Sequence, residues 1–153
     1  MMKIKELKLN TDKNQKLSAS YELFKNLLSE LRARNLPQET VNFINTEVDQ
    51  INATHTSEKD LRNRIKKSLS QIIQRVEKEH KLVTKNHYRN TWLVIGMAVF
   101  GIPIGVTFGA SLGNIALLSL GLPIGMVVGI AVGTAKDKKA FEEGRQLDLE
   151  VKH

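Results

Sequence analysis

The chain has 153 residues, of which 41% are hydrophobic and 25% are charged, and its formal net charge is +7. It contains no cysteine, which excludes disulfides, thiolate metal sites and a cysteine nucleophile. The charges are segregated, because residues 1–90 hold 18 Lys/Arg and 11 Asp/Glu, residues 91–135 hold none, and residues 136–153 hold five of each sign. Since no apolar run follows the lysine-rich residues 1–10, we expect no signal peptide.

Residues 1–90 carry three apolar stripes with helical spacing. The first predicts a helix from about Asp12 to Arg34, and Pro37 suits the first turn of the next helix. A linker follows at residues 52–55, after which Thr56 or Ser57 can cap a third helix. Ser57 with Asp60 resembles a capping box, with Asp in place of the usual Glu or Gln. The stripes are Leu17, Tyr21, Phe24, Leu28 and Leu31; Val41, Ile44, Val48 and Ile51; and Leu61, Ile65, Leu69, Ile72, Val76 and Val83.

These three helices predict a cytoplasmic helical domain over residues 1–90. The stripes could meet as a small bundle within one subunit, or they could pair between subunits as a coiled coil. Neither proline nor glycine occurs between Thr56 and Ile95. We therefore expect the third helix to be continuous with the first transmembrane helix.

The uncharged residues 91–135 are long enough for two membrane crossings, since one crossing takes about 20 residues. Gly113-Asn114 is a turn dipeptide near the middle of this run. It predicts a hairpin with transmembrane helices at 91–112 and 115–135, and it places Pro103 and Pro123 near mid-depth. The expected fold is an all-α membrane protein that ends in a charged cytoplasmic tail, residues 136–153.

Basic residues flank the apolar run on both sides, whereas the turn carries none. The positive-inside rule then places both termini in the cytoplasm, in keeping with a bacterial inner membrane. Trp92 and Tyr88 would lie at the inner interface. The basic residues are Lys78, Lys81, Lys85, His87 and Arg89 before the run, and Lys136, Lys138 and Lys139 after it.

Glycine recurs at every fourth position in both halves, GIPIGVTFGASLG and GLPIGMVVGIAVG. Small residues let helix backbones approach closely in lipid, where packing rather than hydrophobicity drives association. We expect helix packing through Gly101, Gly105, Gly109, Gly113, Gly121, Gly125, Gly129 and Gly133.

This pattern, over residues 96–133, resembles the glycine zipper of two-helix bacterial membrane proteins and of some channel-lining helices. The resemblance implies an all-helical membrane segment with close helix packing. Residues 1–90 carry no such resemblance.

The face opposite the glycines is weakly polar in the first transmembrane helix and apolar in the second. At 100° per residue, Thr107, Ser111 and Asn114 fall across from the glycines, in line with Pro103 and Gly96. The hydroxyls could bond a carbonyl one turn back, or they could face a water-filled axis in an assembly. The candidate pore-lining residues are Phe100, Pro103, Thr107, Ser111 and Asn114.

Lys81, Lys85 and Arg89 would form a basic mouth that attracts anions, including lipid headgroups. Glu77 and His80 lack the further ligands that a metal site in a helical bundle needs. Few aromatic residues accompany the basic run at 59–67, so a nucleic-acid partner is not expected, and no cofactor is expected either.

The leading hypothesis is a homo-oligomeric membrane protein that forms an ion or small-solute channel, with the first transmembrane helix around the axis. One alternative is a non-conducting scaffold whose helical domain recruits a cytoplasmic protein partner. Another is a membrane-permeabilising effector. We expect membrane lipid as a partner in every case, and no enzymatic activity.

Overall fold

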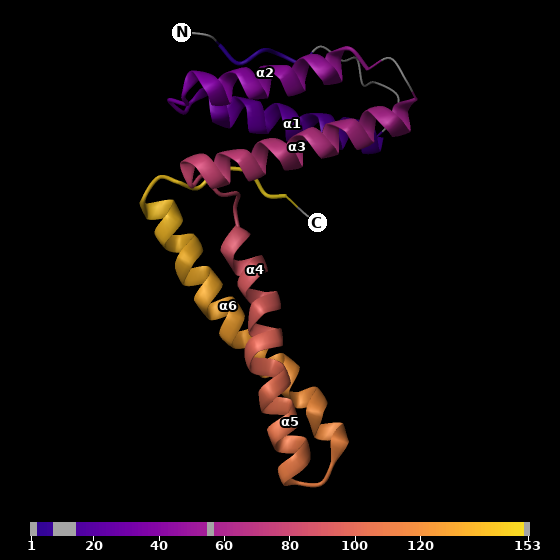
Figure 1. The fold of residues 1–153 in the computed structure, drawn as a ribbon, viewed down its shortest axis with the longest axis vertical. Helices are drawn as coiled ribbons and strands as arrows, with labels where there is room; N and C mark the ends of the chain where they lie inside the picture. Colours follow the sequence, from indigo (N-terminus) through magenta and orange to yellow (C-terminus); the bar gives the residue numbers. More distant parts are fainter. Residues whose placement is uncertain (1–2, 8–14, 55–56, 152–153) are drawn as a thin grey trace. The chain divides into compact units, whose positions relative to one another are not determined.

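The computed structural model describes residues 3–7, 15–54 and 57–151, and the regular elements in these ranges are all helical (Figure 1). This confirms the predicted all-α class for the described part of the chain. Contacts divide the chain into two units, one formed by residues up to Thr84 together with those from Leu147 onward, the other by Lys85–Gln146. The elements are α1 (Gln15–Arg32), α2 (Gln38–Asn52), α3 (Glu58–His80), α4 (His87–Gly96), the π-helical η1 (Met97–Gly101), α5 (Ile102–Ser111), the 3-10 turn η2 (Ile115–Leu117) and α6 (Leu118–Glu142).

The first unit is built around the apolar stripes of its three helices. Phe24 on α1, Ile44 on α2 and Ile65 on α3 are fully buried in one shared core, and α1 and α2 both contact α3. The predicted cap of the third helix is confirmed, since the Asp60 amide donates to Ser57 Oγ at 3.3 Å. Asp12, where the first helix was expected to begin, lies outside the described residues.

Two extended segments complete this core, and neither is visible as a periodic pattern in the sequence. Near the N-terminus, Ile4 and Leu7 are buried against the helices. Near the C-terminus, Leu147 and Leu149 are buried in the same core. The expected charged tail is therefore structured, because α6 continues to Glu142 and the chain then returns to the first unit.

The prediction that the third helix continues into the first apolar helix is wrong. Helix α3 ends at His80, and Lys81 adopts a left-handed conformation with φ of 57°. The amides of Lys81 and Leu82 bond back to the carbonyls of Glu77 and Val76 and so close the last turn. Positive φ is unfavourable for lysine. Burial of the two residues that follow it, Leu82 and Val83, at 7% and 1% exposure, offsets this cost.

The chain leaves the first unit just after Val83 and re-enters it at Leu147. The Leu147 amide donates to the Val83 carbonyl at 2.8 Å. The two ends of the intervening segment, residues 85–146, are thus held together by a backbone hydrogen bond within the first unit. The second unit is an insertion into the first.

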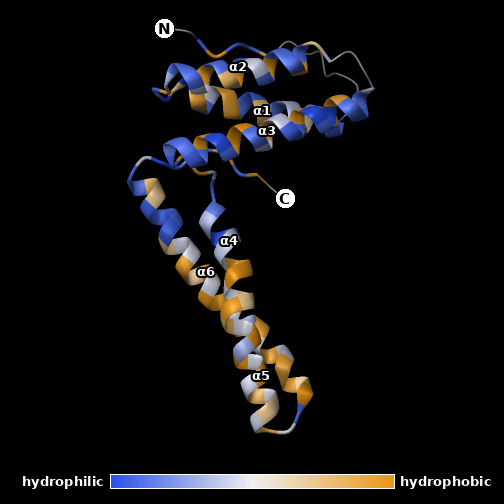
Figure 2. Ribbon diagram, in the orientation of Figure 1, coloured by the Kyte–Doolittle hydropathy of each residue, from blue (hydrophilic) through white to orange (hydrophobic). Residues whose placement is uncertain are grey.

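The second unit is a helical hairpin in which α4, η1 and α5 lie along α6 (Figure 1). The chain reverses at Gly113, whose φ is 62°, and at Asn114, which is extended. A positive φ suits glycine because it has no Cβ. Figure 2 shows white to orange residues, with little strong blue, in α5 and most of α6, whereas orange and blue residues alternate in α1, α2 and α3.

Candidate functional site

The hairpin contains two helices that are long and apolar enough to cross a membrane. They run from His87 to Ser111 and from Ile115 to Glu142, and only 22% and 17% of their most apolar windows are buried. Large apolar side chains are instead exposed, among them Val94 at 60%, Ile115 at 86% and Val127 at 66%. A core helix of a soluble protein would bury such residues, and exposed apolar surface of this extent marks an interaction with a membrane or a protein.

The two arms of the hairpin approach so closely that side chains are excluded between them. A Cβ on Gly125 would lie 2.5 Å from the Gly101 nitrogen and from the Gly96 oxygen, and one on Gly133 would lie 2.5 Å from the Arg89 Cα. Real Cβ atoms essentially never come this close to another heavy atom. We call this contact the glycine seam; it also includes Gly105, Gly121 and Gly129, all buried.

Gly96 joins the seam because of the π-helical segment η1. Gly96 and Gly101 are five residues apart, which in a regular α-helix would rotate them about 140° out of line. In η1 the Ile102 amide bonds to the Met97 carbonyl, so that the wider turn absorbs one extra residue. The expectation that Gly96 shares the weakly polar face with Pro103 is therefore wrong.

Pro103 gives a reason for the position of η1. Proline has no amide to donate to the preceding turn, and its ring crowds the carbonyl four residues earlier, here that of Val99. A local π turn just before the proline relieves this crowding. In α6, by contrast, Pro123 lies inside an α-helix, and its neighbours Gly121 and Gly125 keep the regular spacing of four.

Two of the glycines expected in helix packing differ from the rest. Gly113 lies in the turn, where a Cβ would meet nothing within 4 Å. A Cβ on Gly109 would make an ordinary contact, 3.5 Å from the Asn114 oxygen. The tight part of the seam therefore ends at Gly105, and the arms are looser near the turn.

The candidate pore-lining residues all lie on the outside of the hairpin. Phe100 is 41% exposed, and Pro103, Thr107, Ser111 and Asn114 are exposed as well. Thr107 Oγ1 donates to the Pro103 carbonyl at 2.9 Å, which is the local bond that the sequence left open as an alternative. Asn114 Oδ1 accepts from the Ala116 amide and caps the next turn.

At the opposite end of the hairpin, a buried carboxylate ties α6 to the start of α4. Asp137 is 7% exposed, and its oxygens accept from the amides of Tyr88 and Arg89 at 3.0 and 2.8 Å. Both amides belong to the first turn of α4, where backbone amides have no carbonyl acceptor within the helix. Sequence reasoning missed this contact, although Asp137 continues the spacing of four set by Gly129 and Gly133.

The basic residues expected at a mouth are divided between the units. Lys81 belongs to the first unit, Lys85 and Arg89 belong to the second, and all three are exposed. Lys136 lies over the ring of Trp92, with Nζ 5.3 Å from the ring centroid, which is a cation–π geometry.

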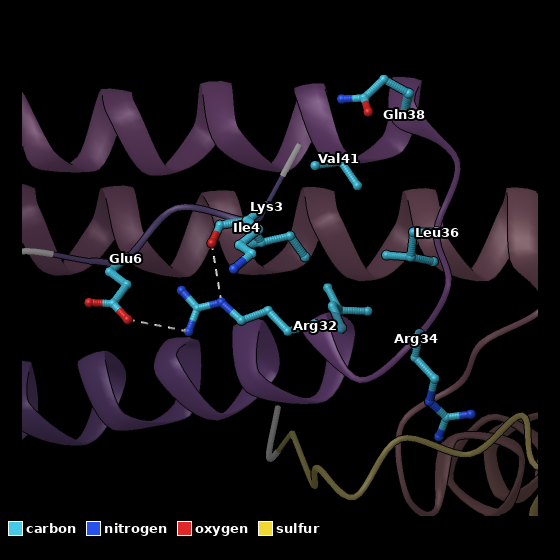
Figure 3. A pocket seen from close by; sticks show the side chains of 9 residues that line it. Lys3, Ile4, Glu6, Arg32, Arg34, Leu36, Gln38 and Val41 are labelled. Atoms are coloured by element: carbon cyan, nitrogen blue, oxygen red, sulfur yellow. Dashed lines mark hydrogen bonds and ion pairs between the residues drawn. The ribbon is translucent and has the colours of Figure 1, made fainter. Parts of the chain in front are cut away.

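The first unit contains a cavity of 490 Å³ beside the N-terminal segment (Figure 3). Arg32 lines this cavity and donates hydrogen bonds to the Ile4 and Lys5 carbonyls, so its guanidinium already has partners within the fold. The lining is Lys3, Ile4, Glu6, Leu31, Arg32, Arg34, Leu36, Gln38 and Val41.

A polar cluster joins α2 to the end of α3 in the same unit. Arg75 bonds to Glu79 at 3.1 Å and to Glu39 at 2.8 Å, and its guanidinium lies 4.7 Å from the Phe43 ring centroid. The hydrogen bond from Arg75 holds the pKa of Glu79 below its ordinary value. His80, singled out in the sequence beside Glu77, has its Nε2 at 2.8 Å from Thr40 Oγ1.

Comparison with protein-family models, with curated proteins and with solved structures gives no match to this chain. The function is therefore inferred from the two features described above. These are an exposed hairpin that has no charge between residues 91 and 135 and is closed by the glycine seam, and a helical unit from which the hairpin emerges and to which it returns.

Proposed function

We propose that this chain is an integral membrane protein in which a self-packed hairpin anchors a cytoplasmic helical bundle to the bilayer. The observation that carries the proposal is the exposed apolar surface of both arms, without a charge between residues 91 and 135. A lipid environment stabilises this surface, whereas water would not.

The proposed orientation places both termini and the bundle in the cytoplasm of a bacterium, and the turn outside. The bond between Val83 and Leu147 supports it, because both ends of the hairpin must then lie on one side of the bilayer. Lys85, Arg89 and Lys136 flank the apolar arms, while Gly113-Asn114 carries no charge. The positive-inside rule favours the basic end in the cytoplasm.

The glycine-zipper resemblance acquires a specific role in this proposal. Most zipper glycines already contact the other arm of the same chain, so they stabilise the hairpin itself. In lipid, such close contact gains dispersion and Cα–H···O interactions along the whole interface. Any homo-oligomer would then associate through the outer faces of the hairpin or through the bundle.

The geometry favours the anchor over the channel as the primary role. A rigid hairpin whose small residues face inward holds the bundle at the surface, where it can recruit a cytoplasmic protein partner. The bundle core is contiguous and includes segments from both ends of the chain, so it is a separate folded unit. No catalytic role is proposed.

A channel is the second candidate, and the exposed weakly polar face favours it. Thr107, Ser111 and Pro103 lie on that face, and copies arranged with this face inward would line an axis with hydroxyls. Phe100 would narrow the axis, and Lys81, Lys85 and Arg89 would form a basic entrance. Permeabilisation of a target membrane would use the same face.

Two measurements test and separate these roles. An anchor predicts that the full-length protein stays with membranes after alkaline carbonate extraction and that purified protein is silent in planar bilayers. Recovery in the carbonate supernatant would refute the membrane role. Discrete conductance steps whose size changes in Thr107→Val would favour the channel over the anchor. The matched control is Thr134→Val, because Thr134 lies in α6 outside this face and should leave any conductance unchanged.

A further inference from the structure

The charged end of the hairpin brings two cations to the chain's single tryptophan. Lys136 lies over the Trp92 ring, with Nζ 5.3 Å from its centroid. Arg89 precedes Trp92 by three residues in α4, which places the two side chains next to each other on the helix surface. We call Arg89, Trp92 and Lys136 the basic flank.

The cations of the basic flank differ from the neighbouring lysines in their partners. Lys138 and Lys139 lie 3.8 and 3.9 Å from carboxylate oxygens one turn further on, those of Glu142 and Glu143. Within the described part of the chain, neither Arg89 nor Lys136 forms an ion pair with a carboxylate. Both side chains are exposed, so their charge is available to an anion from outside.

The backbone beneath the basic flank is fixed in position. The Arg89 amide donates to Asp137 Oδ2 at 2.8 Å, and the Arg89 Cα packs on Gly133 so tightly that a Cβ there would lie 2.5 Å away. Asp137 adjoins Lys136 in α6 and is itself 7% exposed. An anion bound between Arg89 and Lys136 would therefore order only two side chains, which lowers the entropic cost of binding.

Exposed apolar surface continues from Trp92 along the arm. Ile95 and Val99 follow Trp92 by three and seven residues and are 36% and 55% exposed. A ligand that matches both parts has an anionic head and long apolar chains.

We propose that the basic flank binds the phosphate of an anionic glycerophospholipid, whose acyl chains lie along Ile95 and Val99. The inference rests on the proposed membrane anchor and adds a lipid class to it. A free phosphate would match the cations and leave the apolar surface uncovered. Each cation near a membrane surface contributes roughly fivefold to the affinity for an anionic lipid.

Trp92 is a built-in reporter for the test, because it is the only tryptophan in the chain. Full-length protein is reconstituted in phosphatidylcholine vesicles that contain either brominated phosphatidylglycerol or brominated phosphatidylcholine, and quenching of Trp92 is normalised to vesicles without bromine. We expect the quenching of Trp92 to show a severalfold higher affinity of the protein for phosphatidylglycerol than for phosphatidylcholine. Arg89→Gln and Lys136→Gln should each reduce this preference roughly fivefold.

Lys138→Gln is the matched control, since Lys138 lies about 200° around α6 from Lys136 and carries the same charge. Its preference should equal that of the native chain. An equal loss in Lys138→Gln would indicate diffuse surface charge and overturn the lipid site, as would relief of quenching by millimolar inorganic phosphate.

The outcomes also separate the lipid site from the membrane anchor. Equal quenching by both brominated lipids would overturn the lipid site and leave the hairpin in the bilayer. Absence of quenching by either lipid would overturn the membrane placement and the lipid site together.

Discussion

Adding one methyl group to the glycine seam should open the hairpin, while adding it near the turn should not. In Gly125→Ala the new Cβ would lie 2.5 Å from backbone atoms of both Gly96 and Gly101, whereas ordinary contact begins at 3.4 Å. Backbone cannot rotate away as a side chain can, so the two arms must separate by roughly 1 Å to reach an ordinary carbon contact distance.

A separation of this size forfeits about a quarter to a half of the dispersion energy of each contact affected. Forced overpacking of a well-packed interface costs about 1–3 kcal/mol. Alanine also gains about 1 kcal/mol of helix propensity over glycine, measured in water, and this gain partly offsets the cost. We therefore expect Gly125→Ala to lower the free energy of unfolding by up to about 2 kcal/mol.

Gly109→Ala is the matched control, because its Cβ would make an ordinary contact at 3.5 Å from the Asn114 oxygen. Here only the helix propensity acts, and stability should be unchanged or higher by up to about 1 kcal/mol. The assay is unfolding of the purified protein in dodecylmaltoside by SDS titration, followed by helix content. If Gly125→Ala is as stable as Gly109→Ala, the close approach of the arms is refuted.

Three further predictions concern the ends of the hairpin and the helical unit. Asp137→Ala removes the acceptor of the partly buried Tyr88 and Arg89 amides and should cost about 1–3 kcal/mol in the same titration, whereas Asp137→Asn should recover part of the loss. Replacing residues 85–146 by a short glycine-containing turn should give a water-soluble, helical protein by circular dichroism, and Leu147→Asp in that variant should unfold it. The Arg75 contact lowers the folded-state pKa of Glu79, so this carboxylate stabilises the fold above its ordinary pKa of 4.5, and that stability is lost as pH falls through the folded-state pKa. Glu79→Gln should lack this contribution, so its free energy of unfolding should fall less steeply in an acid titration.

The helical class and the two apolar helices were predictable because they depend on composition and period alone. Residues 91–135 contain no charged residue, which is not expected for a core helix of a soluble protein. The stripes of the first three helices have unambiguous helical spacing. The predicted apolar stripes are buried except for Tyr21, which is partly buried, and Phe24, Ile44 and Ile65 are fully buried.

The end of α3 was not predictable, because no local residue marks it. Lys81 has no intrinsic preference for a left-handed backbone, and only the burial of Leu82 and Val83 in the tertiary structure selects it. The return of Leu147 and Leu149 to the core has the same origin, since two leucines in a charged segment carry no periodic pattern.

The prediction of the helix face on which Gly96 lies failed for a different reason. A helical wheel assumes a constant rotation per residue, and η1 breaks that assumption. A spacing of five between Gly96 and Gly101, directly before Pro103, was the available signal. Asp137 likewise continued the glycine spacing beyond Gly133 and could have been placed at the seam.

In the proposed topology, the hairpin spans a bilayer with its turn outside and both of its ends inside. Because the chain contains no cysteine, single substitutions report single positions. In spheroplasts treated with a membrane-impermeant maleimide, Asn114→Cys in the turn should label fully, whereas Ser29→Cys in α1 and Glu150→Cys near the C-terminus should label only after lysis. Labelling of Ser29→Cys before lysis, or protection of Asn114→Cys from labelling, would refute this topology.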